Sequence, residues 1–314
     1  MTITPADASS SISGGRAWAK KLGPVGVWSI DVERLAAADA RAYAQQLERL
    51  SVTVVWIQES LGSKEVFAHA GLLLAATERL IVATGIANIW ARDPVAMANG
   101  QRTLEDAYPG RFLLGLGVSH APVIDVRGLG AHWERPLERM RTYLDAMEKA
   151  PYTGRAVTTP RVLAALGPKM LKLAAERTLG AHPYFVPVEH TTIARKVLGA
   201  GPLLAVEQAA VLATDPATAR ATARRHMKRY LELDNYTNTL RRLGWEDADL
   251  VNGGSDSLVD ALVAWGDTAA IRRRVDDHLT RGADHVAVQI VRVDLKTPAS
   301  QEWQTLAPAL LAGR

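Results

Sequence analysis

The stretch LIVATGIANIWARDPVAMANGQRTLEDAYPGRFLLGLGVSH, residues 80–120, contains one complete strand–helix–strand unit. An apolar run over residues 80–88 predicts a strand, and Asp93 followed by Pro94 is typical of a helix start. Pro109 and Gly110 end that helix, and a second apolar run follows over residues 111–120. Neither run alternates apolar and polar residues, so we expect both strands to be covered on both faces, as in a parallel sheet.

The same succession of apolar run and helix continues on both sides of this unit. Further strands are predicted over residues 23–29, 52–60, 161–167, 181–186, 203–214 and 283–291. Together with the two strands above, they make eight strands, each followed by a helix. Eight such units favour an α/β fold closed into a (β/α)8 TIM barrel over an open doubly wound sheet.

Two segments fall outside this repeat. Residues 1–20 are rich in Ser, Gly and Ala, which predicts a flexible N-terminal tail before a single barrel domain over residues 21–314. Residues 234–266 include the glycine-rich sequence NGGSD and interrupt the succession of units. They are interpreted as an insertion before the last βα unit that could serve as a lid.

The composition limits the classes of function. The 314 residues are 48% hydrophobic and include no cysteine, which excludes disulfides and a cysteine nucleophile and agrees with a cytoplasmic location. We expect no membrane segment, because no apolar run is long enough and the first residues do not resemble a signal peptide. The net charge of +4 forms no basic stripe, so nucleic acid is not an expected partner. No histidine pair has metal-ligand spacing, so we predict no metal.

In a TIM barrel, functional residues lie at the carboxyl ends of the strands, where they converge on one pocket. The residues expected there are Gln58, Glu59, Ser60, Gly85, Ile86, Asn88, Gly117, Ser119, His120, Leu166, Gly167, Pro168, Lys169, His182, Tyr184, Glu207, Gln208 and Gln289.

Among these strand ends, the turn over residues 166–169 has the clearest physical role. Gly167 lets the backbone approach a ligand closely, and Pro168 in the first helical turn leaves free N–H groups that favour an anion such as a cofactor phosphate. The alternative is an ordinary turn between a strand and a helix.

Two further residues allow two interpretations each, and one glycine-rich sequence allows one. His120 could donate a proton or bind substrate, or it could be a loop histidine bonded to the backbone. Glu59 could act as a base or orient a ring, or it could form a helix cap or a surface salt bridge. The LGLG sequence over residues 114–117 lacks the third glycine of a dinucleotide-binding motif, so we interpret it as close packing in the barrel.

The order of these motifs resembles the luciferase-like family of flavin and deazaflavin barrels, especially actinobacterial members that use coenzyme F420. The resemblance covers residues 24–292. It rests on the stretches VVWIQES, ATGIANIWARDPVAMANGQRTLEDAYPGRFLLGLGVSH, RPLERMRTYLDAM, LAALGPKMLKLAAERTLGAHPYF, GGSDSLVDALVAWGD and GADHVAVQ.

The resemblance implies a coenzyme F420-dependent oxidoreductase that transfers a hydride between the cofactor and a small organic substrate, acting as a homodimer. It implies a cis peptide bond between Gly85 and Ile86 behind the cofactor ring, and a phosphate site at Gly167, Pro168 and Lys169. The remaining expected cofactor contacts are Ser60, Gly117, Leu166 and His182.

His120 is the expected proton donor, and Glu59 is the other catalytic candidate. Two positions depart from the family pattern: an Asp-His pair often found after the second strand reads Glu59-Ser60 here, and a Glu that some members have after the fourth strand reads His120. The first departure puts in doubt any mechanism that uses a histidine at that point.

Other functions stay open at this point. The same barrel could belong to a flavin mononucleotide (FMN) monooxygenase, because both cofactors present a tricyclic ring and a phosphate. A non-catalytic deazaflavin-binding protein is a second alternative, which the Glu59-Ser60 departure supports. A barrel lyase would need a Schiff-base lysine or a metal cluster at the strand ends.

Overall fold

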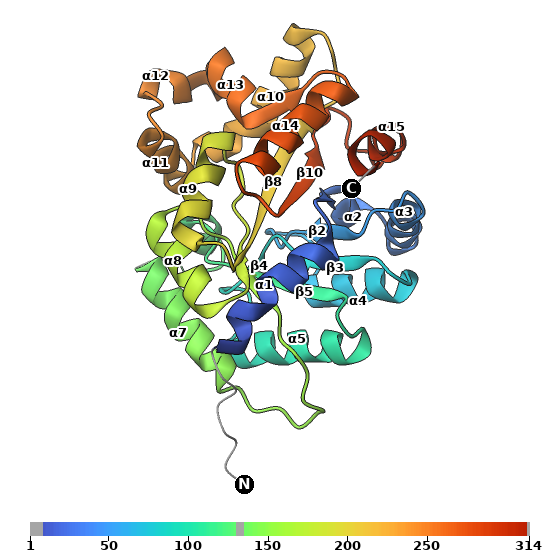
Figure 1. Cartoon of the computed structure of the whole chain (residues 1–314), viewed down its shortest axis with the longest axis vertical. Coiled ribbons are helices and arrows are strands. Elements are labelled where there is room, and N and C mark those ends of the chain that lie inside the picture. The colour runs from blue at the N-terminus through green and yellow to red at the C-terminus, as the bar shows by residue number, and fades with distance from the viewer. Residues whose placement is uncertain (1–8, 130–134, 313–314) are drawn as a thin grey trace.

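The centre of the computed structural model is a ring of eight parallel strands surrounded by helices (Figure 1). The structure describes residues 9–129 and 135–312. The strands of the ring, in order, are β1 (Val25–Trp28), β2 (Val54–Ile57), β3 (Ile81–Thr84), β5 (Phe112–Gly117), β6 (Arg161–Leu163), β7 (Gly180–Ala181), β8 (Leu203–Val211) and β10 (His285–Ile290). Strand β10 pairs with both β8 and β1, which closes the ring. The predicted TIM barrel and its eight strands are confirmed.

The third predicted strand is divided in two. Strand β4 (Ala87–Asn88) follows β3 after a break and pairs with β5. At the end of β3, the Thr84 hydroxyl donates to the Gly115 carbonyl at 2.7 Å and accepts the Gly115 N–H at 2.8 Å. A Cβ at Gly115 would lie 1.9 Å from the Thr84 carbonyl oxygen, so only glycine fits there. The interpretation of LGLG as close packing is confirmed.

Helices cover the outside of the ring. Their bounds are α1 (Ser9–Leu22), α2 (Asp31–Arg34), α3 (Ala37–Arg49), α4 (Val66–Ala76), α5 (Pro94–Ala107), α6 (Ala121–Asp125), α7 (Pro136–Glu148), α8 (Pro168–Arg177), α9 (Val188–Leu198), α10 (Pro216–Leu231), α14 (Thr268–Thr280) and α15 (Ser300–Leu311). The predicted start of α5 is confirmed, because the Asp93 side chain accepts the N–H groups of Val95 and Ala96. Across residues 9–129 and 135–312, no helix has both the length and the apolar character that crossing a bilayer requires.

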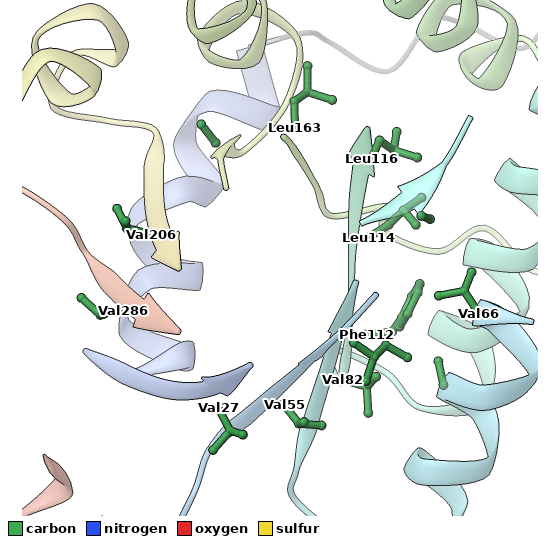
Figure 2. Close-up of a cluster of buried hydrophobic side chains, with 14 of the residues drawn as sticks. Val27, Val55, Val66, Val82, Phe112, Leu114, Leu116, Leu163, Val206 and Val286 are labelled. Carbon is green, nitrogen blue, oxygen red and sulfur yellow. The ribbon is translucent and has the colours of Figure 1, made fainter. Parts of the chain in front are cut away.

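Successive residues of each strand face opposite sides of the barrel wall. Figure 2 shows part of the outward set, including Val27, Val55, Val82 and Val206, in the layer between strands and helices. The inward set packs along the barrel axis and includes Trp28, Val54, Trp56, Ala83, Leu113, Val162, Leu203, Ala205 and Ala287. This alternation decides which strand-end residues can reach the opening of the barrel.

The amino-terminal segment differs from the sequence-based expectation. The sequence predicts a flexible tail over residues 1–20, but residues 9–20 belong to α1, and residues 1–8 lie outside the described residues. Leu22 at the end of α1 is fully buried against the inward-facing core. A Cβ at Gly15 would lie 2.6 Å from the Gly201 carbonyl oxygen. The small residues that resemble a tail in the sequence therefore permit close packing of this helix on the barrel.

The segment over residues 234–266 forms a set of short elements beside α10 (Figure 1). They are α11 (Asp234–Arg242), α12 (Asp247–Leu250), the 3-10 helix η2 (Val251–Gly253), α13 (Asp256–Leu262) and β9 (Val263–Trp265), which pairs with the end of β8. Tyr236 of α11 and Tyr230 of α10 share a hydrophobic cluster with Phe185, which follows β7. The insertion therefore packs over the carboxyl ends of β7 and β8, and its movement as a lid stays a prediction.

Candidate functional site

The turn between β3 and β4 contains a cis peptide bond between Gly85 and Ile86, as the resemblance implies. The Gly85 N–H donates to the Ile57 carbonyl at 2.7 Å, and the Ile86 carbonyl accepts the Glu59 N–H at 3.1 Å. These two hydrogen bonds attach the turn to the end of β2. Gly85 and Ile86 are partly exposed while the flanking strand residues are buried, so the turn forms part of the barrel opening.

The Glu59 side chain holds the same turn in place. Its two carboxylate oxygens form an ion pair with the two terminal nitrogens of Arg92, and Oε2 also accepts the Asn88 N–H at 2.8 Å. The side chains of Glu59 and Arg92 are only 6% and 12% exposed. Because both oxygens are engaged, the geometry favours a role in positioning the turn over acid–base catalysis. Ser60, the next residue, lies in an exposed turn.

Two buried ring nitrogens lie next to Gly85. Trp28 Nε1 and His182 Nε2 have no hydrogen-bond partner among the described residues, and a Cβ at Gly85 would lie 2.7 Å from the first and 2.8 Å from the second. His182 Nδ1 donates to the Ala205 carbonyl at 2.8 Å, so Nε2 carries a lone pair. Burial lowers the pKa of His182 to about 4, so this ring is neutral at pH 7. One donor and one acceptor are therefore free beneath the cis turn.

Strand β5 ends on the other side of the turn. A Cβ at Gly117 would lie 2.5 Å from Ile86 Cγ1, so glycine is needed for this close approach. His120 is partly exposed, and its Nδ1 lies 3.0 Å from Asn235 Oδ1 on α11. Because Asn235 Oδ1 can only accept, Nδ1 donates and Nε2 is left as an acceptor. Burial lowers the pKa of His120, so the ring is neutral at pH 7 and Nε2 can accept a hydrogen bond.

The turn over residues 166–169 begins helix α8 with Gly167 as the N-cap and Pro168 as the first helical residue. Leu166 and Gly167 are partly exposed, and Pro168 and Lys169 are exposed. Pro168 has no N–H and the Met170 N–H donates to the Gly167 carbonyl, so Lys169 carries the first backbone N–H of the helix that is left for a ligand. The sequence-based prediction of a helix start at this point is confirmed, and phosphate binding there stays a proposal.

Arg242 on α11 lies next to this turn. The sequence did not indicate this proximity. Its Nη2 atom would be 3.7 Å from a Cβ at Gly167 and donates to Thr239 Oγ1 at 2.7 Å. No carboxylate of the described residues forms an ion pair with Arg242. A guanidinium group without an acidic partner therefore stands beside a helix N-terminus.

A chain of hydrogen bonds runs across the β7 and β10 side of the opening. The Tyr184 hydroxyl donates to Gln289 Oε1 at 2.9 Å and lies 2.7 Å from the Tyr230 hydroxyl, which also accepts from Arg229. Each hydroxyl has one hydrogen, so Tyr230 must donate to Tyr184 while it accepts from Arg229. Tyr184 is the partly exposed member of the two tyrosines, and its ring centroid is 5.2 Å from that of Trp28.

Glu207 and Gln208, expected at a strand end, both lie in the middle of β8, and only Glu207 faces the barrel interior. Gln208 donates to the Leu262 carbonyl on α13 and interacts with His278 on α14, so it points outward. Glu207 is 2% exposed, and burial raises its pKa to about 8. Both residues are sequence-based candidates, and the structure places only Glu207 on the inward face of β8.

Two hollows lie elsewhere on the molecule. One of about 480 Å³ opens between α3 and α4, and another of about 320 Å³ opens beside α2. Neither is lined by a strand-end residue, so neither belongs to the site described above.

A family model described as "Luciferase-like monooxygenase" matches residues 22–285, which is well over half of the chain. The chain belongs to the luciferase-like monooxygenase family. The luciferase-like chain is 27% identical over 185 residues to the 5,10-methylenetetrahydromethanopterin reductase of Methanolobus tindarius, a match that covers 51% of this chain and 56% of the relative. It spans about half the length of the curated relatives it matches.

Solved structures with the same fold include a protein that uses coenzyme F420 and a protein that binds FMN. An F420-dependent secondary alcohol dehydrogenase, in complex with an F420–acetone adduct, superimposes with a TM-score of 0.71 at 15% identity, covering 92% of this chain and 99% of that chain. The oxygenating constituent of 3,6-diketocamphane monooxygenase from Pseudomonas putida, in complex with FMN, gives 0.65 at 16% identity, covering 91% and 96%. At these identities the likeness shows the shared luciferase-like fold.

The residues of this luciferase-like site fit a flat ring that carries a phosphate. Trp28 Nε1 and His182 Nε2 are buried polar atoms without partners beneath Gly85, and Gly117 removes a side chain beside Ile86. The start of α8 and Arg242 offer hydrogen-bond donors and positive charge to an anion. Polar atoms without partners, a helix start and a nearby guanidinium thus follow the strands of the barrel.

Proposed function

We propose that this luciferase-like protein is an oxidoreductase that binds coenzyme F420 at the carboxyl end of its barrel and acts on a small organic substrate. The reduced deazaflavin supplies a hydride in such reactions. The observation that carries the proposal is the pair of free nitrogens of Trp28 and His182 next to Gly85, in a turn that Glu59 and Arg92 hold in place.

The chain's own residues would hold the cofactor at two places. The Gly85–Ile86 turn and Gly117 would support the ring, with Trp28 as donor and His182 as acceptor for polar atoms at its edge. The Lys169 N–H and the Arg242 guanidinium would bind the phosphate beside Gly167 and Pro168. Ser60 and Leu166, both accessible at the opening, stay proposed contacts.

His120 and the insertion would act on the substrate side. His120 stays our candidate for the proton donor, and its Nε2, an acceptor in the neutral ring, would take up the proton before passing it to the substrate. Asn235 and Tyr236 of α11 contact the His120 ring, so closure of the proposed lid would also position this histidine. The acetone adduct of the structurally similar alcohol dehydrogenase makes small ketones and alcohols the first substrates to test.

An FMN-dependent monooxygenase is the second candidate, because a structurally similar protein binds FMN. Titration of the purified protein with each cofactor, followed by cofactor fluorescence, separates the two. We expect saturable binding of coenzyme F420 that is tighter than binding of FMN. Saturable binding of FMN alone would support the second candidate, and binding of neither would overturn both. We also propose that the protein is a homodimer. Sedimentation equilibrium tests this by measuring its molecular mass in solution.

A further inference from the structure

Arg229, near the end of α10, holds its guanidinium group against the tyrosines of the barrel opening. Its Nη2 atom donates to the Tyr230 hydroxyl, and the guanidinium carbon lies 4.5 Å from the centroid of the Tyr230 ring. The Tyr230 hydroxyl in turn lies 2.7 Å from the hydroxyl of the partly exposed Tyr184. Although Arg229 is an exposed residue, its charged group is therefore held in one place beside the opening.

The Arg229 guanidinium forms no ion pair with any residue in the ranges 9–129 and 135–312. Two other arginines of the same helix, Arg220 and Arg224, are paired with acidic residues of α13. Glu207 does not neutralise Arg229 either, because burial raises the pKa of Glu207 to about 8 and leaves it mostly protonated at pH 7. A guanidinium held against neutral hydroxyls is available to an anion that comes from outside the described protein.

A continuous series of ring contacts connects Arg229 with His120. Next to Arg229, the Tyr230 ring centroid lies 5.4 Å from that of Tyr236, which lies 5.3 Å from that of His120. In the other direction, the Tyr184 ring contacts that of Trp28, which lies beside the cis turn. Arg229 therefore belongs to the same opening as the proposed proton donor and the proposed support of the cofactor ring.

The groups between Arg229 and His120 carry no charge at pH 7. Burial raises the pKa of Tyr230 and of Tyr236, so both hydroxyls stay protonated. Burial lowers the pKa of His120, and the charge of Arg229 lowers it further, so this ring is neutral. The positive charge of Arg229 is therefore not balanced by its neighbours on this side of the opening.

We propose that Arg229 binds a carboxylate group of the substrate, so that the protein acts on ketones that carry an acid group. The inference rests on the proposed function and names the class of its substrate. A planar carboxylate accepts two N–H groups of one guanidinium side by side, and Nη2 is the only nitrogen of Arg229 that donates to a described residue. One carboxylate also matches one guanidinium in charge, whereas a phosphate ester would bring nearly two negative charges.

Isothermal titration calorimetry of the cofactor-free protein tests this proposal without turnover. The probes are pyruvate, a ketone with a carboxylate, and methyl pyruvate, which has the same ketone without the charge. We expect pyruvate to bind at least about tenfold more tightly than methyl pyruvate, since hydrogen bonds to charged groups are the stronger ones. Equal affinities of the two probes, or no binding of pyruvate, would overturn the proposal, and this comparison needs no variant.

Two variants of Arg229 assign the binding to this side chain. Arg229→Gln should weaken pyruvate binding by about tenfold and leave that of methyl pyruvate unchanged. Arg229→Lys should restore part of the affinity, because lysine keeps the charge but lacks the paired donors. Unchanged pyruvate binding in Arg229→Gln would place the carboxylate elsewhere and overturn the proposal.

Arg225→Gln is the matched control, because Arg225 is an exposed arginine of the same helix with no hydrogen bond or ion pair to a described residue. It removes the same charge from α10, and its affinity for pyruvate should equal that of the wild-type protein. Equal losses in Arg225→Gln and Arg229→Gln would show that only the net charge matters, which would also overturn the proposal.

Turnover separates this inference from the proposed function. In the reduction of pyruvate, a hydride adds to the carbonyl carbon and a proton to its oxygen, which gives lactate. With reduced coenzyme F420, Arg229→Gln should raise KM for pyruvate about tenfold and change kcat by less than about twofold, because the carboxylate takes no part in the reaction. Turnover with equal KM for pyruvate and methyl pyruvate would overturn the inference while the proposed function holds. Failure of the wild-type protein to bind coenzyme F420 would overturn the proposed function, and the calorimetric result would still decide whether Arg229 binds a carboxylate.

Discussion

The carboxylate of Glu59 and the guanidinium of Arg92 form a two-point ion pair across the turn that joins β3 to β4. The same carboxylate accepts the Asn88 N–H, so one side chain fixes both the ion pair and the backbone of the turn. Both side chains are nearly buried. Removing Arg92 would leave the buried Glu59 carboxylate without a cation.

Arg92→Ala should therefore destabilise the protein and weaken cofactor binding together. We expect the free energy of unfolding to fall by about 3 kcal/mol, the usual cost of breaking a buried ion pair. Glu65→Gln is the control, because Glu65 also contacts Arg92 at 2.8 Å but is 52% exposed, and such pairs contribute at most about 1 kcal/mol. Urea denaturation measures both values, and equal losses in the two variants would contradict the assigned role.

Gly117→Ala should displace the cis turn from the opposite side. The new Cβ would lie 2.5 Å from Ile86 Cγ1, so we expect a loss of about 1–3 kcal/mol from overpacking and weaker binding of coenzyme F420. Gly71→Ala on α4 is the matched control, because its Cβ meets only Leu104 at 3.5 Å and should stabilise the helix by about 0.5–1 kcal/mol. Thermal unfolding and a fluorescence titration report the two effects, and unchanged affinity in Gly117→Ala would rule out ring support at this turn.

The pH dependence of stability should change when Glu207 is replaced by Gln. The pKa of Glu207 is about 8 in the folded protein, against 4.5 for an unperturbed glutamate, so the unfolded chain loses this proton first as pH rises. The contribution of Glu207 to the stability of the wild-type protein is therefore complete below pH 4.5 and is lost as pH rises towards 8. Between pH 5 and pH 8, the free energy of unfolding of Glu207→Gln should rise by up to about 4 kcal/mol relative to that of the wild-type protein, at about 1.4 kcal/mol per pKa unit. A pH-independent difference in urea denaturation would show that Glu207 is ionised.

Arg242→Ala should weaken binding of the phosphate part of the cofactor only. We expect about tenfold weaker binding of coenzyme F420, since a charged hydrogen bond contributes about 1.5–3 kcal/mol, and no change for the same ring system without phosphate. Arg241→Ala is the control on the same helix, because Arg241 pairs with Asp247 instead. Equal loss for the ligands with and without phosphate would place Arg242 outside the anion site.

The sequence predicts the barrel well because its strands are continuous apolar runs that alternate with helices that have clear starts. Asp93 with Pro94 marks one such start, and the structure shows Asp93 capping α5. The tail prediction differs from the structure because the composition of residues 9–20 does not reveal that Gly15 approaches the backbone of residue 201. Close packing against a distant segment leaves no local pattern in the sequence.

The candidate site was predictable in part. The cis bond at Gly85–Ile86 was implied by the family resemblance, and the helix start at Pro168 by the Gly-Pro sequence. The partner of Glu59 could not be read from the sequence, because Arg92 lies 33 residues away. Glu207 and Gln208 were indistinguishable, because in a wholly apolar strand no alternation shows which residue faces inward.

Helix α11 touches both halves of the candidate site, with Asn235 against His120 at one end and Arg242 beside Gly167 at the other. Any exchange of this segment between relatives would consequently alter substrate selectivity and anchoring of the cofactor in a single event. Evolution and protein engineering would have to adjust the two traits together, so chimaeras that transplant only half of the helix are the way to separate them.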